Sequence, residues 1–213
     1  DGELLVSTPK NITASCGLDA LTQLIEAYIS NHSYQLTDAI SWSGLQYFFD
    51  NFYLACTDGS NNLKIRQSLA YSALCSGIAL ANADLGIVHG IAVPLGGFFS
   101  IPHGEACARL LSASLKVNFD ALKKRDNKNP SLFKLLKINN LICVKNINPF
   151  NNNDINSLTN LIDKWINELK IPALSTYNIT NKDIPKILEA TSLRNNPISL
   201  TRLEIKKIIE LSL

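Results

Sequence analysis

The chain has 213 residues, of which 46% are hydrophobic and 18% are charged, which indicates a folded protein with one substantial core and excludes a disordered or fibrous class. The formal net charge is +2 and no dense basic stripe is present, so nothing favours a phosphate backbone and we expect no nucleic-acid partner.

The first part of the chain predicts three long helices after a short opening. Residues 3–7 are β-prone and precede a helix over about residues 11–30, where apolar side chains recur with helical spacing. A Thr-Asp pair typical of an N-terminal cap begins a second expected helix, over residues 37–55. Residues 63–83 combine small and apolar side chains with few charges, which favours a third, central helix.

The segment over residues 86–103 changes character. It holds glycines at four positions, prolines at two, and two of the three histidines of the chain. Such a density of backbone-permissive residues predicts turns and close approaches at which side chains converge. We therefore expect the functional site in this segment.

The second half is richer in Asn, Lys and Ile and predicts weaker amphipathic helices, with an Asn-rich loop at residues 146–156. Strand and helix units do not alternate and no GxGxxG is present, so no doubly wound nucleotide-binding domain is expected. The predicted fold class is all-α, a multi-helix bundle-like domain over residues 1–213, with residues 1–119 forming the core of the site and residues 120–213 forming peripheral helices. The helices expected after residue 100 are 103–119, 132–143, 154–169, 183–190 and 201–211.

One carboxylate and two imidazoles are candidate metal ligands. Asp19 lies in a mainly apolar helix, where an unpaired carboxylate costs several kcal/mol to bury, so a metal ion or a lysine should face it unless it points to solvent. His89 and His103 each fit a hydrogen-bonded core or surface role as well as a ligand role. Together the three side chains suffice for Zn²⁺ or Fe²⁺ with positions left open for a substrate.

The sequence also indicates the cellular compartment of the protein. The five cysteines are odd in number and mostly lie in apolar segments, which favours buried thiols in a reducing compartment. No apolar run reaches the roughly 18 to 20 residues that span a bilayer, and no signal peptide is evident, so we expect a cytoplasmic protein without a membrane partner. The chain starts without Met and contains none, so we expect it to be part of a longer protein. The cysteines are Cys16, Cys56, Cys75, Cys107 and Cys143.

Two motifs resemble those of the iron-containing alcohol dehydrogenase family. TASCGLDALTQLIEAYIS (residues 13–30) is similar to the helix from which that family supplies an aspartate ligand and usually a histidine four residues later. LGIVHGIAVPLGGFFSIPHGEACARLL (residues 85–111) resembles its G-x-x-H-G and P-H-G segments. Similarity at residues 37–39 and 195–209 extends the resemblance to nearly the whole chain.

The resemblance implies the helical, metal-binding domain that this family shares with dehydroquinate synthases, without the N-terminal α/β nucleotide-binding domain. It implies Fe²⁺ or Zn²⁺ held by Asp19, His89 and His103, and reversible oxidation of an alcohol to an aldehyde or ketone with NAD or NADP. The implied partners are the small alcohol or aldehyde and the nucleotide-binding domain of the same protein, and a homo-oligomer is ordinary for such enzymes. These 213 residues alone are expected neither to bind NAD(P) nor to turn over.

Gln23 departs from the family pattern, because it stands where the usual second histidine of the helix would be. At i+4 from Asp19 it projects from the same helix face. Its amide oxygen is a weaker ligand than imidazole, so we interpret Gln23 as a weak fourth metal ligand or the holder of a bound water. The alternative is that it only caps a polar pocket in a protein that has lost its metal.

Further positions near these motifs have expected roles. Val93 stands where some family members carry another histidine, which excludes a proton relay through that position. Glu26 is similar to a family-typical glutamate and is expected to support a ligand or form a salt bridge rather than act in catalysis. His32 is expected at the surface, and core packing is expected for Cys16 and Cys107.

Three alternatives remain open. A dehydroquinate synthase-like lyase shares the two-domain architecture and a similar metal site. A degenerate, non-catalytic helical module fits Gln23 and the missing partner domain, and a plain helical structural protein requires the resemblance to be coincidental. Bound metal separates the enzymes from the other two classes, and oxidation of short alcohols separates a dehydrogenase from a lyase.

Overall fold

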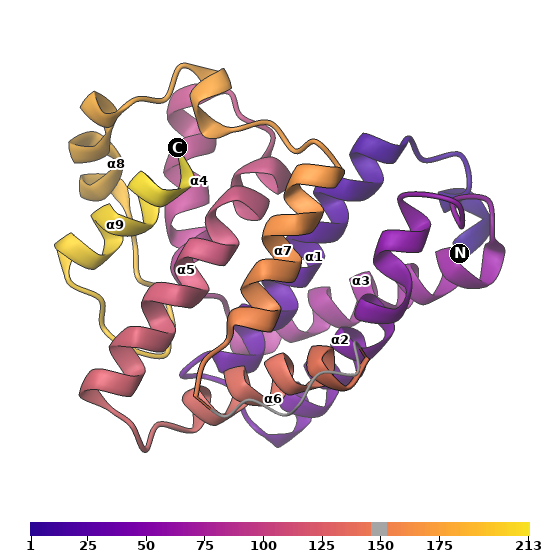
Figure 1. Cartoon of the computed structure of the whole chain (residues 1–213), viewed down its shortest axis with the longest axis horizontal. Helices are drawn as coiled ribbons and strands as arrows, with labels where there is room; N and C mark the ends of the chain where they lie inside the picture. The colour runs from indigo at the N-terminus through magenta and orange to yellow at the C-terminus, as the bar shows by residue number, and fades with distance from the viewer. Residues whose placement is uncertain (146–152) are drawn as a thin grey trace.

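The structure, a computed structural model, describes residues 1–145 and 153–213. Within these residues it contains helices and no strand, which confirms the all-α prediction (Figure 1). The elements in chain order are η1 (Gly2–Leu5), α1 (Lys10–Ile29), α2 (Gln35–Ala55), α3 (Leu63–Ala83), α4 (Ile87–Phe99), α5 (His103–Arg125), α6 (Pro130–Lys145), α7 (Asn156–Glu168), η2 (Leu174–Tyr177), η3 (Asn181–Asp183), α8 (Ile184–Ala190) and α9 (Arg202–Ser212).

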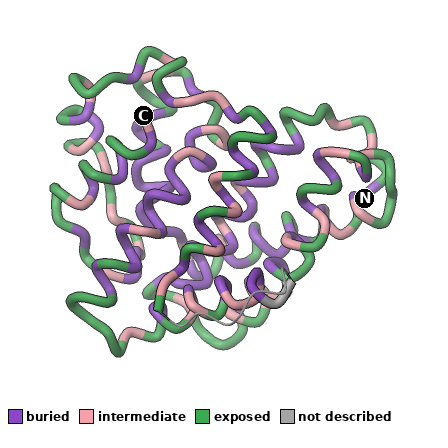
Figure 2. The backbone as a smooth tube through the Cα atoms, in the orientation of Figure 1, coloured by how far each residue is buried: buried purple, intermediate pink, exposed green. Residues whose placement is uncertain are grey.

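Helix α1 lies at the centre of the helical body and contacts α2, α3, α5 and α6. Its apolar residues are buried on more than one side, as the sequence pattern indicates, and Figure 2 shows the buried positions following the inner faces of the helices. A polar side chain in the middle of such a helix therefore faces other helices rather than bulk water.

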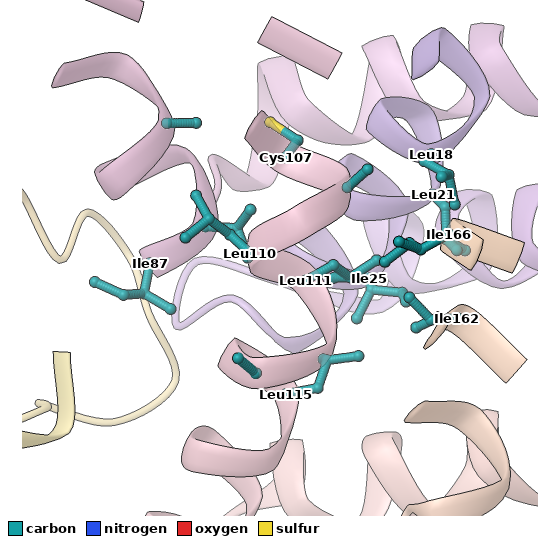
Figure 3. Packing of buried hydrophobic residues seen from close by; sticks show 14 of the residues in the cluster. Leu18, Leu21, Ile25, Ile87, Cys107, Leu110, Leu111, Leu115, Ile162 and Ile166 are labelled. Atoms are coloured by element: carbon teal, nitrogen blue, oxygen red, sulfur yellow. The ribbon is translucent and has the colours of Figure 1, made fainter. Parts of the chain in front are cut away.

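One continuous hydrophobic cluster joins the two halves of the chain, from Ala14 in α1 to Ile209 in α9. Burying each large aliphatic side chain contributes about 1.5–3 kcal/mol, so this core fixes α1, α5 and α7 against one another. The division into a site core over residues 1–119 and peripheral helices stays a prediction. Figure 3 shows members of the cluster, among them Leu18, Leu21 and Ile25 of α1, Ile87 of α4, Leu110, Leu111 and Leu115 of α5, and Ile162 and Ile166 of α7.

The prediction of turns over residues 86–103 was wrong for most of that segment, because Ile87–Phe99 forms α4 with Pro94 inside it. An internal proline costs a helix about 3 kcal/mol or more. Apolar side chains at helical spacing offset that cost, since four of them are buried and each contributes about 1.5–3 kcal/mol. These four are Ile87, Val88, Ile91 and Leu95.

Two helix starts also differ from expectation. Residues 3–7 were expected to be β-prone, but Gly2–Leu5 form a 3₁₀ turn in which the Asp1 side chain accepts a hydrogen bond from the Glu3 amide at 3.0 Å. The second helix begins at Gln35 rather than at residues 37–38, because Thr37 closes a capping box with Tyr34 from inside the first turn.

Of the described part of the expected Asn-rich loop, residues 153–155 are non-helical, and residues 146–152 lie outside the described residues. No single helix in the described ranges is long and apolar enough to cross a membrane; α3 and α4 meet that criterion only as a pair, bent by 98° at the break between them.

Candidate metal centre

Three helices bring the predicted carboxylate and imidazoles together. Asp19 comes from the middle of α1, His89 from the first turn of α4, and His103 from the first residue of α5. Oδ1 of Asp19 lies 3.3 Å from Nε2 of His89 and 3.7 Å from Nε2 of His103. The two imidazole centroids are 5.3 Å apart. The sequence therefore identified three side chains that share one site.

The site is closed on one side and open on the other. The side chain of His89 is 5% exposed and that of Asp19 is 19% exposed, whereas the side chain of His103 is 47% exposed. A molecule that reaches the group from solvent therefore approaches beside His103.

Glycines that follow the two histidines permit the close packing of this site. A Cβ at Gly104 would lie 2.5 Å from the carbonyl oxygen of Ser15, so only glycine lets the start of α5 lie against α1 here. A Cβ at Gly90 would lie 1.8 Å from the carbonyl oxygen of Ser192, in the segment that leads from α8 to α9. The two contacts set the positions of His103 and His89.

Glu26 holds the imidazole of His89 from behind. Its Oε2 lies 2.7 Å from Nδ1 of His89, and its Oε1 accepts a hydrogen bond from the backbone N–H of Val88 at 2.7 Å. With the Nδ1 proton donated to Glu26, the lone pair of Nε2 points toward Asp19, which is the orientation of a ligating histidine. The expected supporting role of Glu26 agrees with these contacts.

The negative charge of the site favours a bound cation. Burial lowers the pKa of His89, but the close contacts and negative charges of Asp19 and Glu26 outweigh burial and raise this pKa to about 9. Burial raises the pKa of Asp19, but His89 and His103 together lower it below its usual value. The Asp19 carboxylate thus favours a positive charge beside it, which a proton on His89 or a metal ion supplies.

Separations within the group fit ligands of a common ion better than direct hydrogen bonds. The 2.7 Å contact of His89 with Glu26 has the length of a charge-assisted hydrogen bond, whereas the contacts of Asp19 with both histidines are longer than about 2.9 Å. Oδ1 of Asp19 is buried and has no hydrogen-bond partner, which costs about 1–3 kcal/mol. The donor set therefore fits a divalent cation.

Gln23 lies beside the group but presents its amide nitrogen to it. Nε2 of Gln23 donates to Oδ2 of Asp19 at 3.2 Å, and Oε1 accepts from Oγ of Ser76 at 3.0 Å. In this orientation Gln23 holds the aspartate, and its oxygen is turned away from the two imidazoles. Its role as a ligand stays a prediction.

Cys107 is the site residue that the sequence analysis missed. It is fully buried, as expected, but its Sγ lies 3.7 Å from Nε2 of His89 and 3.5 Å from Nε2 of His103. Among the described residues, the possible ligand atoms of Asp19, His89, His103 and Cys107 all lie within 4.8 Å of one another. The available signal was its spacing, since Cys107 is four residues after His103 and shares its helix face.

Other expectations had mixed outcomes. Cys16 is exposed, so the prediction that it packs in the core was wrong: it lies on a part of α1 that the neighbouring helices leave uncovered. His32 and Val93 are exposed, and His32 lies at the surface as expected. The other buried thiols agree with prediction: Cys56, Cys75 and Cys143.

The chain is similar to known proteins in sequence. Residues 13–213 match the family described as "Fe-containing alcohol dehydrogenase family, C-terminal". A 1,3-propanediol dehydrogenase of Citrobacter freundii is 41% identical over 121 residues, which cover 57% of this chain and 31% of that protein. An NADPH-dependent butanol dehydrogenase of Clostridium saccharobutylicum is 29% identical over 221 residues, which cover 99% of this chain and 53% of that protein.

The fold is similar as well. The crystal structure of a 1,3-propanediol oxidoreductase matches 100% of this chain and 55% of its own with a TM-score of 0.86 and 30% identity. Aligned over nearly its whole length, the chain thus spans about half of a relative: 53% of the butanol dehydrogenase and 55% of the oxidoreductase structure.

Proposed function

This chain belongs to the Fe-containing alcohol dehydrogenase family, and from that premise we propose that it is the metal-binding part of an enzyme that interconverts an alcohol and an aldehyde or ketone. The observation that carries the proposal is the convergence of His89 and His103 on the buried, unpartnered Oδ1 of Asp19. Relatives named as propanediol and butanol dehydrogenases support a small alcohol as the substrate.

Asp19, His89 and His103 would hold the ion, Fe²⁺ or Zn²⁺. Glu26 would keep Nε2 of His89 aimed at it, and Gln23 would keep Asp19 in place. A divalent cation supplies Lewis-acid chemistry, which stabilises negative charge on an alcohol oxygen and polarises a carbonyl. The side of the site next to the half-exposed His103 would admit the substrate.

Hydride transfer needs a second component. We assign that chemistry to nicotinamide, NAD or NADP, because the described helices offer no chemical group that accepts a hydride. The name of the butanol dehydrogenase relative specifies NADPH. The nucleotide-binding domain would come from a part of the protein outside these residues, so we expect the 213-residue chain to bind metal without turning over alcohols.

The test is the metal content of the chain after reconstitution with Fe²⁺ or Zn²⁺. We expect about one ion per chain, and strong loss of binding in Asp19→Asn and His89→Ala. Asp163→Asn is the matched control, since Asp163 pairs with Lys116 at the surface, 3.0 Å away, and does not belong to the group. A reconstituted chain that binds no metal would instead identify a degenerate helical module.

The reaction class has its own test. Full-length protein loaded with metal should oxidise short alcohols with NAD⁺ or NADP⁺, and the rate should fall with Asp19→Asn. Metal binding without any alcohol-dependent reduction of the nucleotide would favour a lyase of the dehydroquinate synthase type.

A further inference from the structure

The group around Asp19 contains a fourth possible ligand, the thiol of Cys107. Its side chain is fully buried, and its Sγ approaches Nε2 of both histidines. Those two nitrogen atoms also approach Oδ1 of Asp19. One sulfur, two nitrogens and one oxygen, on three helices, therefore surround a common point.

Four of the six separations among these atoms match the edges of a coordination tetrahedron, and all six are within 4.8 Å. With metal bonds of about 2.0–2.2 Å to nitrogen and oxygen and about 2.3 Å to sulfur, a tetrahedron has edges of about 3.4 Å between nitrogen and oxygen and about 3.6 Å between nitrogen and sulfur. The nitrogen–oxygen edges here are 3.3 and 3.7 Å, and the nitrogen–sulfur edges are 3.7 and 3.5 Å. The nitrogen–sulfur distances therefore agree with their ideal value as closely as the nitrogen–oxygen distances do.

Gln23 fits the fourth position less well. Its amide nitrogen faces Asp19 and acts only as a hydrogen-bond donor, so it cannot coordinate a cation. Its amide oxygen already accepts a hydrogen bond from Ser76. The contacts of Cys107 are instead with other members of the group, the two imidazole nitrogens and the Asp19 carboxylate. The two candidates therefore differ in what they present to the centre of the group.

We propose that Sγ of Cys107 is a ligand of the metal, so that Asp19, His89, His103 and Cys107 form its protein donor set. The inference rests on the metal site of the proposed function and specifies its fourth donor. When the ion binds, the S–H bond breaks, the proton leaves to solvent, and the sulfur forms a bond to the metal with no change of oxidation state.

Two consequences follow from a thiolate donor. Thiolate is a softer ligand than carboxylate or imidazole, so the site should prefer Zn²⁺ to Fe²⁺ more strongly than a site without sulfur does. Four protein donors fill a tetrahedron, so a substrate oxygen would need a fifth position at the metal.

The experiment uses Co²⁺ and Zn²⁺ as probes on the reconstituted chain. A cobalt–thiolate bond gives a near-ultraviolet charge-transfer band, and X-ray absorption of the zinc form gives a metal–sulfur distance of about 2.3 Å. We expect both signals in the unmutated chain. Cys107→Ser should remove the band and lower zinc affinity by more than the roughly 100-fold upper range for losing an outer-shell partner.

Cys16→Ser is the control, because it removes the exposed thiol on α1, the helix that carries Asp19, and should leave the band intact. If Cys107→Ser does not fold, the X-ray absorption spectrum of the unmutated chain still decides the question, because it shows directly whether sulfur is bound to the metal. One bound metal per chain without a sulfur neighbour overturns the role of Cys107 and leaves the proposed function standing. Failure to bind Co²⁺ or Zn²⁺ at all overturns both.

Discussion

Glu26 contacts two parts of α4 through one carboxylate. It accepts hydrogen bonds from the backbone N–H groups of Val88 and His89, at 2.7 and 3.4 Å, and it holds Nδ1 of His89. A carboxylate at a helix N-terminus is stabilised by the helix dipole as well as by these donors. The same side chain thus secures the start of α4 and the orientation of the His89 imidazole.

We expect Glu26→Gln to weaken metal binding about 10–100-fold, the usual cost of losing a partner that orients a ligand. The amide has nearly the same size but lacks the charge that fixes the Nδ1 proton, and its NH₂ group would face backbone donors. Equilibrium dialysis with Zn²⁺ measures the change. Glu210→Gln, which alters an exposed pair with Lys206, should leave affinity unchanged; equal affinity in both variants would contradict the assigned role of Glu26.

At this scale the sequence predicted that Asp19, His89 and His103 share a site, but not that Cys107 lies with them. Asp19 stood out because it interrupts an apolar helix, and His89 and His103 because they flank a Gly/Pro-rich segment. Cys107 did not stand out, because a cysteine in an apolar helix has the pattern of an ordinary core residue. Only the tertiary contact with both histidines distinguishes it.

Helix α4 depends on the segment between α8 and α9. The carbonyl of Ser192 lies against Gly90, and the Asn196 side chain accepts a hydrogen bond from the N–H of Ile87 at 3.2 Å. These contacts link residues more than 100 positions apart. The glycines and prolines of residues 86–103 predicted turns, because a local sequence pattern does not contain the distant contacts that stabilise α4.

Two glycines of α4 should therefore respond in opposite ways to the same substitution. Gly90→Ala would place a methyl group 1.8 Å from the Ser192 oxygen, so we expect a loss of about 1–3 kcal/mol in the free energy of unfolding. Gly96 has nothing within 4 Å of an added Cβ, and Gly96→Ala should gain up to about 1 kcal/mol from helix propensity. Urea unfolding of both variants is the measurement, and a neutral Gly90→Ala would refute the close contact.

A contact between Asp84 and the segment that joins α8 to α9 predicts that the stability of the protein depends on pH. Burial raises the pKa of Asp84, but hydrogen bonds from Arg194 and the Leu85 amide outweigh it and lower this pKa below its usual value of 3.8. A carboxyl with a lowered folded-state pKa contributes stability above its unfolded pKa and loses it as the pH falls through the folded value. Stability should therefore decline below about pH 4 in part through Asp84.

Asp84→Asn isolates this contribution. The amide keeps a hydrogen-bond acceptor and tolerates the positive φ of 57° at this position, but it does not titrate in this range. We expect the variant to lose less stability than the unmutated chain between pH 5 and pH 2.5, roughly the range over which such a carboxyl titrates. Denaturant curves at several pH values show the difference, and parallel declines would rule out the Asp84 contribution.

At the scale of the whole molecule, the class of the fold follows from the sequence but the arrangement does not. Helical spacing without alternating strands was enough to predict an all-α domain. The packing order depends on distant pairs, such as the backbone hydrogen bond from Asn31 to Asn195 at 3.0 Å and the Asn31 side chain on the Asn196 carbonyl. Two asparagine-containing turns 160 residues or more apart give no local signal that they meet.

A metal ion would connect three helices that are far apart in the chain, so its removal should destabilise the whole domain. An ion at 100 times its dissociation constant adds about 2.7 kcal/mol to the free energy of unfolding. For a domain of this size each kcal/mol shifts Tm by about 2–4 °C, so chelation should lower Tm by about 5–10 °C. Differential scanning fluorimetry with and without chelator measures the shift. In Asp19→Asn, chelation should hardly change Tm, because the variant lacks the carboxylate oxygen that lies between the two histidines and should therefore bind little metal. An unchanged Tm after complete removal of a bound ion would mean that the ion sits elsewhere than between α1, α4 and α5.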